Sequence, residues 1–164
     1  MLIFLDTEFT DFIDCDLVSI GMITEDGQSF YAERTDFNYD WCNDFVRSAV
    51  WAHLGADPNA KVKRDELRER LVSWFKTLPA SVQVAADSFT DWELLIDALD
   101  GQKPENLTGY VDLRPLGESK VFNEAVCAHH AVPGRPWHHA YYDAAATRMG
   151  WLAQVAADSA GSQG

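Results

Sequence analysis

Two acidic residues follow directly on an apolar segment near the start of the chain. Residues 2–5 are all apolar, and Asp6 and Glu8 come next with one residue between them. If the apolar run is a buried strand, both carboxylates project from the same side at its end, because side chains two apart along a strand point the same way. Mg²⁺ and Mn²⁺ prefer such oxygen ligands. The chain has 26 Asp and Glu residues, however, so two acids alone would more often mark a solvated strand end.

A histidine and another carboxylate lie five residues apart near the other end of the chain, at His138 and Asp143. We predict that the histidine lies just before a helix and that the carboxylate lies in its opening turns. A neutral imidazole there can take a proton from a water while the carboxylate holds a metal ion, and hydrolysis of a phosphodiester needs both. Each residue also has an ordinary structural explanation, because a histidine can cap a helix and an acid is favoured at a helix start by the dipole.

The segments that must position these side chains predict an α/β fold. Residues 17–24 and 28–33 have strand-like character, and Asp26 and Gly27 between them predict a tight hairpin. Further along, strands alternate with helices, which is typical of parallel pairing. We therefore expect a mixed sheet, antiparallel first and then parallel, flanked by helices. The other predicted strands are residues 82–86 and 107–113, and the predicted helices are residues 41–53, 61–78, 91–99, 121–130 and 138–155.

The length and the charge of the chain limit its function. At 164 residues with 47% hydrophobic content, it has the size of one domain, which we place at residues 1–155, followed by a disordered tail at residues 156–164. The formal net charge of −13 opposes the wrapping of duplex nucleic acid. It is compatible with an enzyme whose acidic pocket is neutralised by divalent cations and which grips only the end of a single strand.

Two further features concern location and redox state. The sequence has no apolar run long enough to span a membrane, and its start lacks the basic segment and the cleavage site of a signal peptide. We therefore expect a cytoplasmic protein with no membrane partner. The three cysteines, Cys15, Cys42 and Cys127, are odd in number and lack a Cys-x-x-Cys pair, so we expect reduced thiols.

The order of the motifs along the chain resembles that of the DEDDh exonucleases. Residues 6–9, with the sequence DTEF, lie at the end of the first predicted strand, Asp91 follows a later apolar strand, and His138 precedes Asp143 by five residues. They match in order the Asp–Glu–Asp–His–Asp motifs of a family that contains ribonuclease T, oligoribonuclease and the proofreading subunit of bacterial replicative polymerases. The match covers nearly the whole chain and implies a ribonuclease H-like fold. Within the family, the chain is most similar to small stand-alone 3′→5′ exoribonucleases.

This resemblance implies a function and a role for each motif residue. The implied reaction is the hydrolysis of single-stranded RNA 3′ ends to nucleoside 5′-monophosphates with two Mg²⁺ or Mn²⁺ ions. Asp6, Glu8 and Asp143 would hold the first ion, Asp6 would bridge to the second, Asp91 would hold or orient the second, and His138 would be the general base. The family also implies a homodimer and substrate contacts at Thr7, Phe9 and Phe12.

Several alternatives stay open at this point. Asp87 is the second choice for the role of Asp91, and His139 is the second choice for the role of His138, although the five-residue spacing to Asp143 favours His138. The substrate could be single-stranded DNA, because recognition of the 2′-hydroxyl lies outside the motifs. A catalytically inactive nucleic-acid-binding module, an aspartyl-phosphate phosphatase and a zinc site built from Cys127 and its neighbouring histidines are weaker interpretations.

Overall fold

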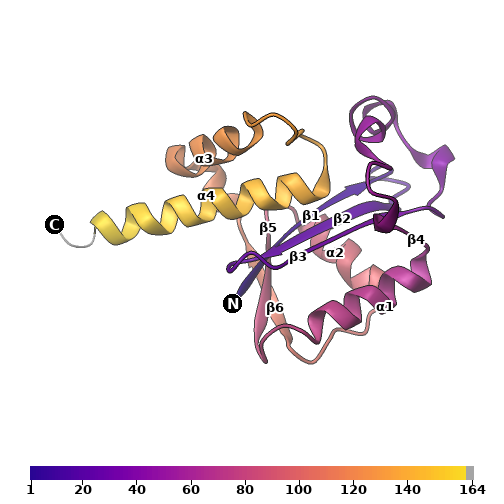
Figure 1. The fold of residues 1–164 in the computed structure, drawn as a ribbon, viewed down its shortest axis with the longest axis horizontal. Helices are drawn as coiled ribbons and strands as arrows, with labels where there is room; N and C mark the ends of the chain where they lie inside the picture. Colours follow the sequence, from indigo (N-terminus) through magenta and orange to yellow (C-terminus); the bar gives the residue numbers. More distant parts are fainter. Residues whose placement is uncertain (162–164) are drawn as a thin grey trace.

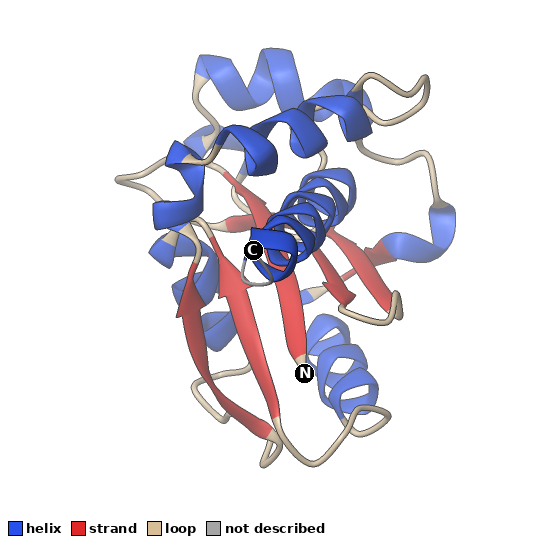
Figure 2. Cartoon of the chain, turned by 90° about the vertical axis from the view of Figure 1, so that its left-hand side faces the viewer, coloured by secondary structure: helices blue, strands red, loops and turns tan. Residues whose placement is uncertain are grey.

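The computed structural model describes residues 1–161, which form a six-stranded mixed sheet with helices on both faces (Figures 1 and 2). The strand order is β4-β3-β2-β1-β5-β6. The strands are β1 (Leu2–Phe9), β2 (Leu17–Thr24), β3 (Ser29–Arg34), β4 (Lys61–Val62), β5 (Val82–Ala86) and β6 (Leu107–Asp112). The first three pair antiparallel, whereas β5 pairs parallel with β1 and β6 pairs parallel with β5. The predicted α/β fold, with antiparallel hairpins first and parallel strands afterwards, is confirmed.

The central strand β1 is covered on both faces, as its apolar run predicts. Ile3 and Leu5 belong to the core beneath helices α1 (Arg64–Phe75) and α2 (Phe89–Ala98), while Phe4 belongs to the core on the opposite face. That opposite face is covered by α4 (Ala140–Gly161), and α3 (Lys120–His130) packs on α4 in turn. The polar end of β1 therefore emerges between two helical layers.

The first turn of α4 lies directly on the sheet at a glycine. Gly21 is the register partner of Asp6 across β1 and β2. A Cβ atom at Gly21 would lie 2.3 Å from the backbone carbon and oxygen of Ala140, much closer than an ordinary contact. Gly150 in α4 makes a similar close approach to the ring of Phe122 in α3. The first contact fixes the start of α4 on the sheet beside Asp6, and the second fixes the start of α3 on α4.

The segment at residues 41–53 differs from the single helix that we predicted. It contains 3₁₀ turns at Tyr39–Trp41 and Trp51–His53 around a π-helical turn at Val46–Val50. The side chain of Asn43 is the physical reason: its Oδ1 accepts a hydrogen bond from the Val46 backbone N–H, as at a helix start, while its Nδ2 donates to Asp11. A helix beginning at Trp41 is incompatible with that cap.

The boundaries of two other helices also differ from the prediction. Helix α1 starts at Arg64 and not near residue 61, because Lys61 and Val62 pair with β3. Helix α4 continues to Gly161, so the prediction that it ends at about Val155 is wrong. Residues 156–160 include three alanines, the strongest helix formers, and Gln154 donates a hydrogen bond to Asp158 over this stretch. Of the predicted tail, residues 162–164 lie outside the described residues.

No helix within residues 1–161 combines the length and the apolar character needed to cross a membrane.

Candidate metal centre

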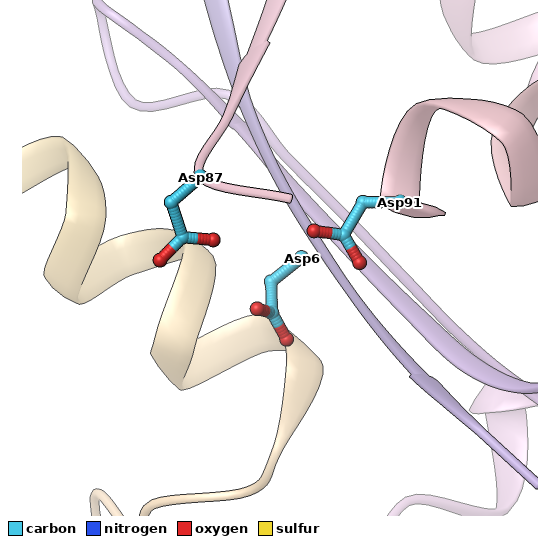
Figure 3. A group of neighbouring side chains, drawn as sticks. All are labelled: Asp6, Asp87 and Asp91. Atoms are coloured by element: carbon cyan, nitrogen blue, oxygen red, sulfur yellow. The ribbon is translucent and has the colours of Figure 1, made fainter. Parts of the chain in front are cut away.

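Carboxylates from four elements converge on Asp6. Oxygen atoms of Asp6, Glu8 and Asp143 lie within 4.8 Å of one another, and so do oxygen atoms of Asp6, Asp87 and Asp91. Figure 3 shows the second group, in which the three side chains point toward one another from β1, from the end of β5 and from the first turn of α2. Asp6 is therefore shared by two groups, each of which could hold a metal ion through oxygen ligands.

The two acids of β1 meet Asp143 on the α4 side of the sheet. Asp6 and Glu8 project from the same face of β1, as the two-residue spacing predicts. Asp143 lies in the first turn of α4, where its Oδ2 accepts a hydrogen bond from the backbone N–H of His139 at 3.0 Å. Because the start of α4 packs closely on Gly21, this carboxylate lies beside Asp6.

The other two acids approach Asp6 from the β5–α2 connection. Asp87 follows directly on β5 and is exposed. Ser88 then caps α2 by accepting a hydrogen bond from Thr90, so Asp91 falls in the first turn of the helix. Asp91 is 3% exposed and accepts a hydrogen bond of 2.6 Å from the hydroxyl of Thr7. Both candidates for the third acid therefore lie beside Asp6.

Burial and mutual repulsion raise the pKa values of most of these carboxyl groups. Burial, and then the charges of Asp91, Asp143, Glu8 and Asp87, raise the pKa of Asp6 well above its usual range. Burial, and then Asp143 and Asp91, raise the pKa of Glu8 to about 8. Burial also raises the pKa of Asp91 to about 7, against the opposing effect of the Thr7 hydroxyl. The ionised cluster is thus unfavourable on its own, and a bound cation would offset its charge.

The pKa of Asp143 is raised by the same cause and is moderated by neighbouring groups. Burial is the largest effect, and it is opposed by the His139 backbone N–H and then by His130 and His138. The donor set of the whole cluster is all carboxylate oxygen, partly buried and rich in negative charge. It suits a hard divalent cation.

The cluster opens into a cavity of about 440 Å³. Asp6, Asp87 and Asp143 line one side, and residues of α3 and the loop after it line another. Among the latter are His130 and Trp137. A ligand in this cavity would therefore reach the shared carboxylate and both of its groups.

The two histidines before α4 differ in their surroundings. His138 is exposed, has a left-handed backbone with φ of 60°, and packs its ring edge-on against Phe45 at 4.8 Å. The ring of His139 instead stacks on Tyr31 at 4.6 Å, and burial lowers its pKa. His138 is therefore the histidine whose ring is open to solvent at this edge of the cluster. Its positive φ also explains why α4 begins at Ala140 and not at residue 138.

The three predicted substrate contacts occupy different environments. Phe12 is 79% exposed, and it packs edge-to-face with the half-buried Phe9 at 5.1 Å. Thr7 points to the other face of β1, where its buried hydroxyl binds Asp91. Its side chain supports a carboxylate of the cluster, which leaves only its backbone for contact with a substrate.

Sequence reasoning missed one side chain of the cluster. The Nε2 atom of His130, at the end of α3, lies 3.1 Å from Oδ1 of Asp143. From the sequence, we considered His130 only as a possible zinc ligand together with Cys127. Within residues 1–161, the two groups of ligating side chains that come together are the carboxylate sets, and neither includes a cysteine or a histidine.

No protein-family model matches the chain, and a search of the curated proteins finds no match either.

Proposed function

We propose that this protein is a metal-dependent 3′→5′ exonuclease of the DEDDh type, with a ribonuclease H-like fold, that acts on single-stranded RNA. The observation that carries the proposal is the convergence of Glu8, Asp87, Asp91 and Asp143 on Asp6, with an exposed histidine beside Asp143. The mixed sheet that holds them, with helices on both faces, is compatible with that fold. The order of the motifs along the chain resembles the same family.

The carboxylates divide naturally into two sets of ligands. One Mg²⁺ or Mn²⁺ ion would be held by Asp6, Glu8 and Asp143. A second ion would be held by Asp6 and Asp91, and Asp87 lies beside them. Bound ions would supply Lewis-acid stabilisation of the negative charge that develops on the scissile phosphate. The raised pKa values of Asp6 and Glu8 support this assignment, because burying acids side by side is costly unless a cation accompanies them.

The proton chemistry falls to His138. Its exposed ring would accept a proton from the water that attacks the phosphate between the last two nucleotides. The bond from that phosphate to the 3′ oxygen of the preceding nucleotide breaks, and this oxygen takes up a proton from solvent. The products are a nucleoside 5′-monophosphate and a strand that is one nucleotide shorter. Phe9 and Phe12 would stack on or wedge the terminal base, since an aromatic ring can contact any base in this way.

Single-stranded RNA is favoured over DNA by the similarity to the small exoribonuclease branch, which also suggests a homodimer. The net charge of −13 fits an enzyme that grips only the end of a strand at a cation-filled site. Single-stranded DNA is the alternative substrate. An inactive binding module is disfavoured, because such a module would usually have lost at least one of the carboxylates or the histidine.

A gel time course with 5′-labelled single-stranded RNA and DNA of equal sequence tests the proposal. Asp6→Asn removes the shared carboxylate with little change in shape, and Asp65→Asn, an exposed acid at the start of α1, is the matched control. We expect a ladder that shortens from the 3′ end with Mg²⁺ or Mn²⁺, is lost with EDTA and in Asp6→Asn, and persists in Asp65→Asn. RNA should be the faster substrate. The absence of a ladder with either metal would refute the proposal.

A further inference from the structure

The cavity beside the carboxylate cluster has two walls of unlike chemistry. The carboxylates of Asp6, Asp87 and Asp143 line one side. The opposite wall comes from α3, from α4 and from the residues around the 3₁₀ turn at Arg114–Glu118, and it is largely apolar. The apolar side chains that line it are Leu113, Phe122, Val126 and Ala146. A ligand with a charged part and a flat apolar part would suit both walls.

Trp137 adds an aromatic surface to this cavity. Its ring stacks on His130 with the centroids 3.8 Å apart, yet 48% of the residue is exposed. One face of the ring is therefore covered, and the remaining surface is open to a ligand in the cavity. A nucleobase can stack on such a ring whatever its identity, because every base has an aromatic face.

Arg114 supplies positive charge at the same cavity, and it is the one lysine or arginine among the lining residues. Its Nε and Nη2 atoms donate to the carboxylate of Asp112 at distances of 2.7 to 3.0 Å, which holds the guanidinium group in place. Within residues 1–161, no group accepts a hydrogen bond from its Nη1 atom. An arginine held in this way suits a phosphate, because its N–H groups lie in one plane and match the phosphate oxygens.

The cavity is separate from the aromatic pair that we assign to the terminal base. Phe9 and Phe12 are not among the described residues that line it. A strand that is cut at the cluster has one nucleotide on each side of the scissile phosphate, so a second nucleotide must lie beside the carboxylates when the terminal one contacts Phe9 and Phe12. The volume of about 440 Å³ is near the lower end of the range of about 300–1,000 Å³ for small-ligand sites, which gives room for one nucleotide.

We propose that this cavity binds the nucleotide that precedes the scissile phosphate, with its base on Trp137 and the apolar wall and its 5′ phosphate at Arg114. The proposal rests on the proposed function, because it takes the cluster to be the place where the strand is cut. It also accounts for strand binding by a chain with a net charge of −13. The contacts next to the cluster are one fixed arginine and a stacking surface, and they need no extended basic groove.

Filling the cavity tests whether a nucleotide binds there. Cys127 is exposed on α3 and lines the cavity, whereas its neighbour Ala128 is exposed and does not line it. Cys127→Trp should lower kcat/KM on a single-stranded RNA oligonucleotide by at least about tenfold, because the base loses its place. The matched control Ala128→Trp should change it by less than about twofold. Mn²⁺ affinity should stay at the wild-type value in both, whereas a general structural defect at the cluster would lower it too.

A second test identifies the part of the strand that lies at Arg114. A methylphosphonate removes the charge of one linkage, and it is placed at the linkage on the 5′ side of the penultimate nucleotide. It should raise the KM of the wild type by about tenfold but that of Arg114→Gln by less than about twofold, because the variant has already lost the contact. Arg70→Gln is the matched control, since Arg70 is also an exposed arginine paired with an acid, on α1, and it should respond as the wild type does.

The outcomes separate this inference from the function on which it rests. If the wild type cuts no RNA, the proposed function is refuted, and the nucleotide site with it. If the wild type cuts RNA but folded Cys127→Trp cuts it as fast as Ala128→Trp, or if the methylphosphonate affects the wild type and Arg114→Gln equally, the nucleotide site alone is refuted. Arg114→Gln changes an exposed side chain, so it decides the question if Cys127→Trp does not fold.

Discussion

The close packing of α4 on Gly21 predicts how a substitution at this glycine would affect the candidate metal centre. In Gly21→Ala, the new Cβ would lie 2.3 Å from the backbone carbon and oxygen of Ala140 and 2.4 Å from the backbone nitrogen of Tyr141. These are backbone atoms, so a rotamer change cannot relieve the clash. Strand β2 and the start of α4 must separate by about 1 Å to reach ordinary van der Waals contact.

The displacement would act directly on the cluster. Asp143 lies in the same first turn as Ala140, whereas Asp6 and Glu8 stay on β1, so the carboxylates that now lie within 4.8 Å of one another would move apart. Overpacking of this kind costs about 1–3 kcal/mol of the free energy of unfolding. A shift of about 1 Å in a catalytic group can slow turnover by about 10²-fold.

Three measurements on Gly21→Ala check this reasoning. They are the free energy of unfolding from denaturant titration, Mn²⁺ affinity, and kcat on an RNA oligonucleotide. Gly161→Ala is the matched control, because a Cβ at the end of α4 meets nothing within 4 Å. The reasoning predicts a folded but less stable Gly21→Ala protein, with weaker Mn²⁺ binding and kcat about 10²-fold lower. A variant that keeps the stability, the Mn²⁺ affinity and kcat of the wild type would show that this contact does not position Asp143.

Three other predictions follow from the same cluster. His138→Ala should leave Mn²⁺ affinity unchanged and slow hydrolysis by roughly 10²–10⁴-fold in single-turnover assays, whereas a large loss of affinity would make His138 a ligand and not a base. Asp91→Asn should reduce kcat far more than Asp87→Asn, and the reverse ranking would transfer the third role to Asp87. The metal-free protein should become less stable as pH rises from about 4.5 to 8. The pKa values of Glu8 and Asp91 are raised in the folded state, so the folded state binds more protons than the unfolded state in this range. Denaturant titrations in EDTA at several pH values measure this loss, which should shrink in Glu8→Gln; a flat profile would contradict the assigned burial.

The sequence predicts the part of the site that depends on one element at a time. The apolar run at residues 2–5 identifies a buried strand, and the two-residue spacing then places Asp6 and Glu8 on one face. The hairpin at Asp26 and Gly27 follows from local turn chemistry, and Gly27 indeed has a φ of 95°. Local periodicity and turn residues are sufficient for these features.

Features that depend on contacts between distant elements could not be predicted in this way. The approach of His130 to Asp143 requires α3 to pack on α4, which depends on the close fit of Phe122 against Gly150. The break in residues 41–53 depends on the hydrogen bonds of the Asn43 side chain to Asp11 and to Val46. Periodicity carries no information on such pairings, because each involves residues from different segments.

Asp87 and Asp91 are alternatives for one role in the sequence, but the structure brings both of them to Asp6. Asp87 and Asp91 are four residues apart, and in the sequence they compete for one role. In the structure, β5 ends at Ala86 and Ser88 caps α2 at once, so the chain reverses within a single turn. The residue after the strand and the residue in the first turn of the helix therefore face the same carboxylate of Asp6 from two sides. Thr7 binds the side chain of Asp91 alone, which fixes that carboxylate and leaves the exposed Asp87 free to adjust to an ion or a substrate. Under the proposed function, the two aspartates would then have different roles, a fixed ligand and an adaptable one, and this difference is the reason to expect Asp91→Asn to be the more damaging change.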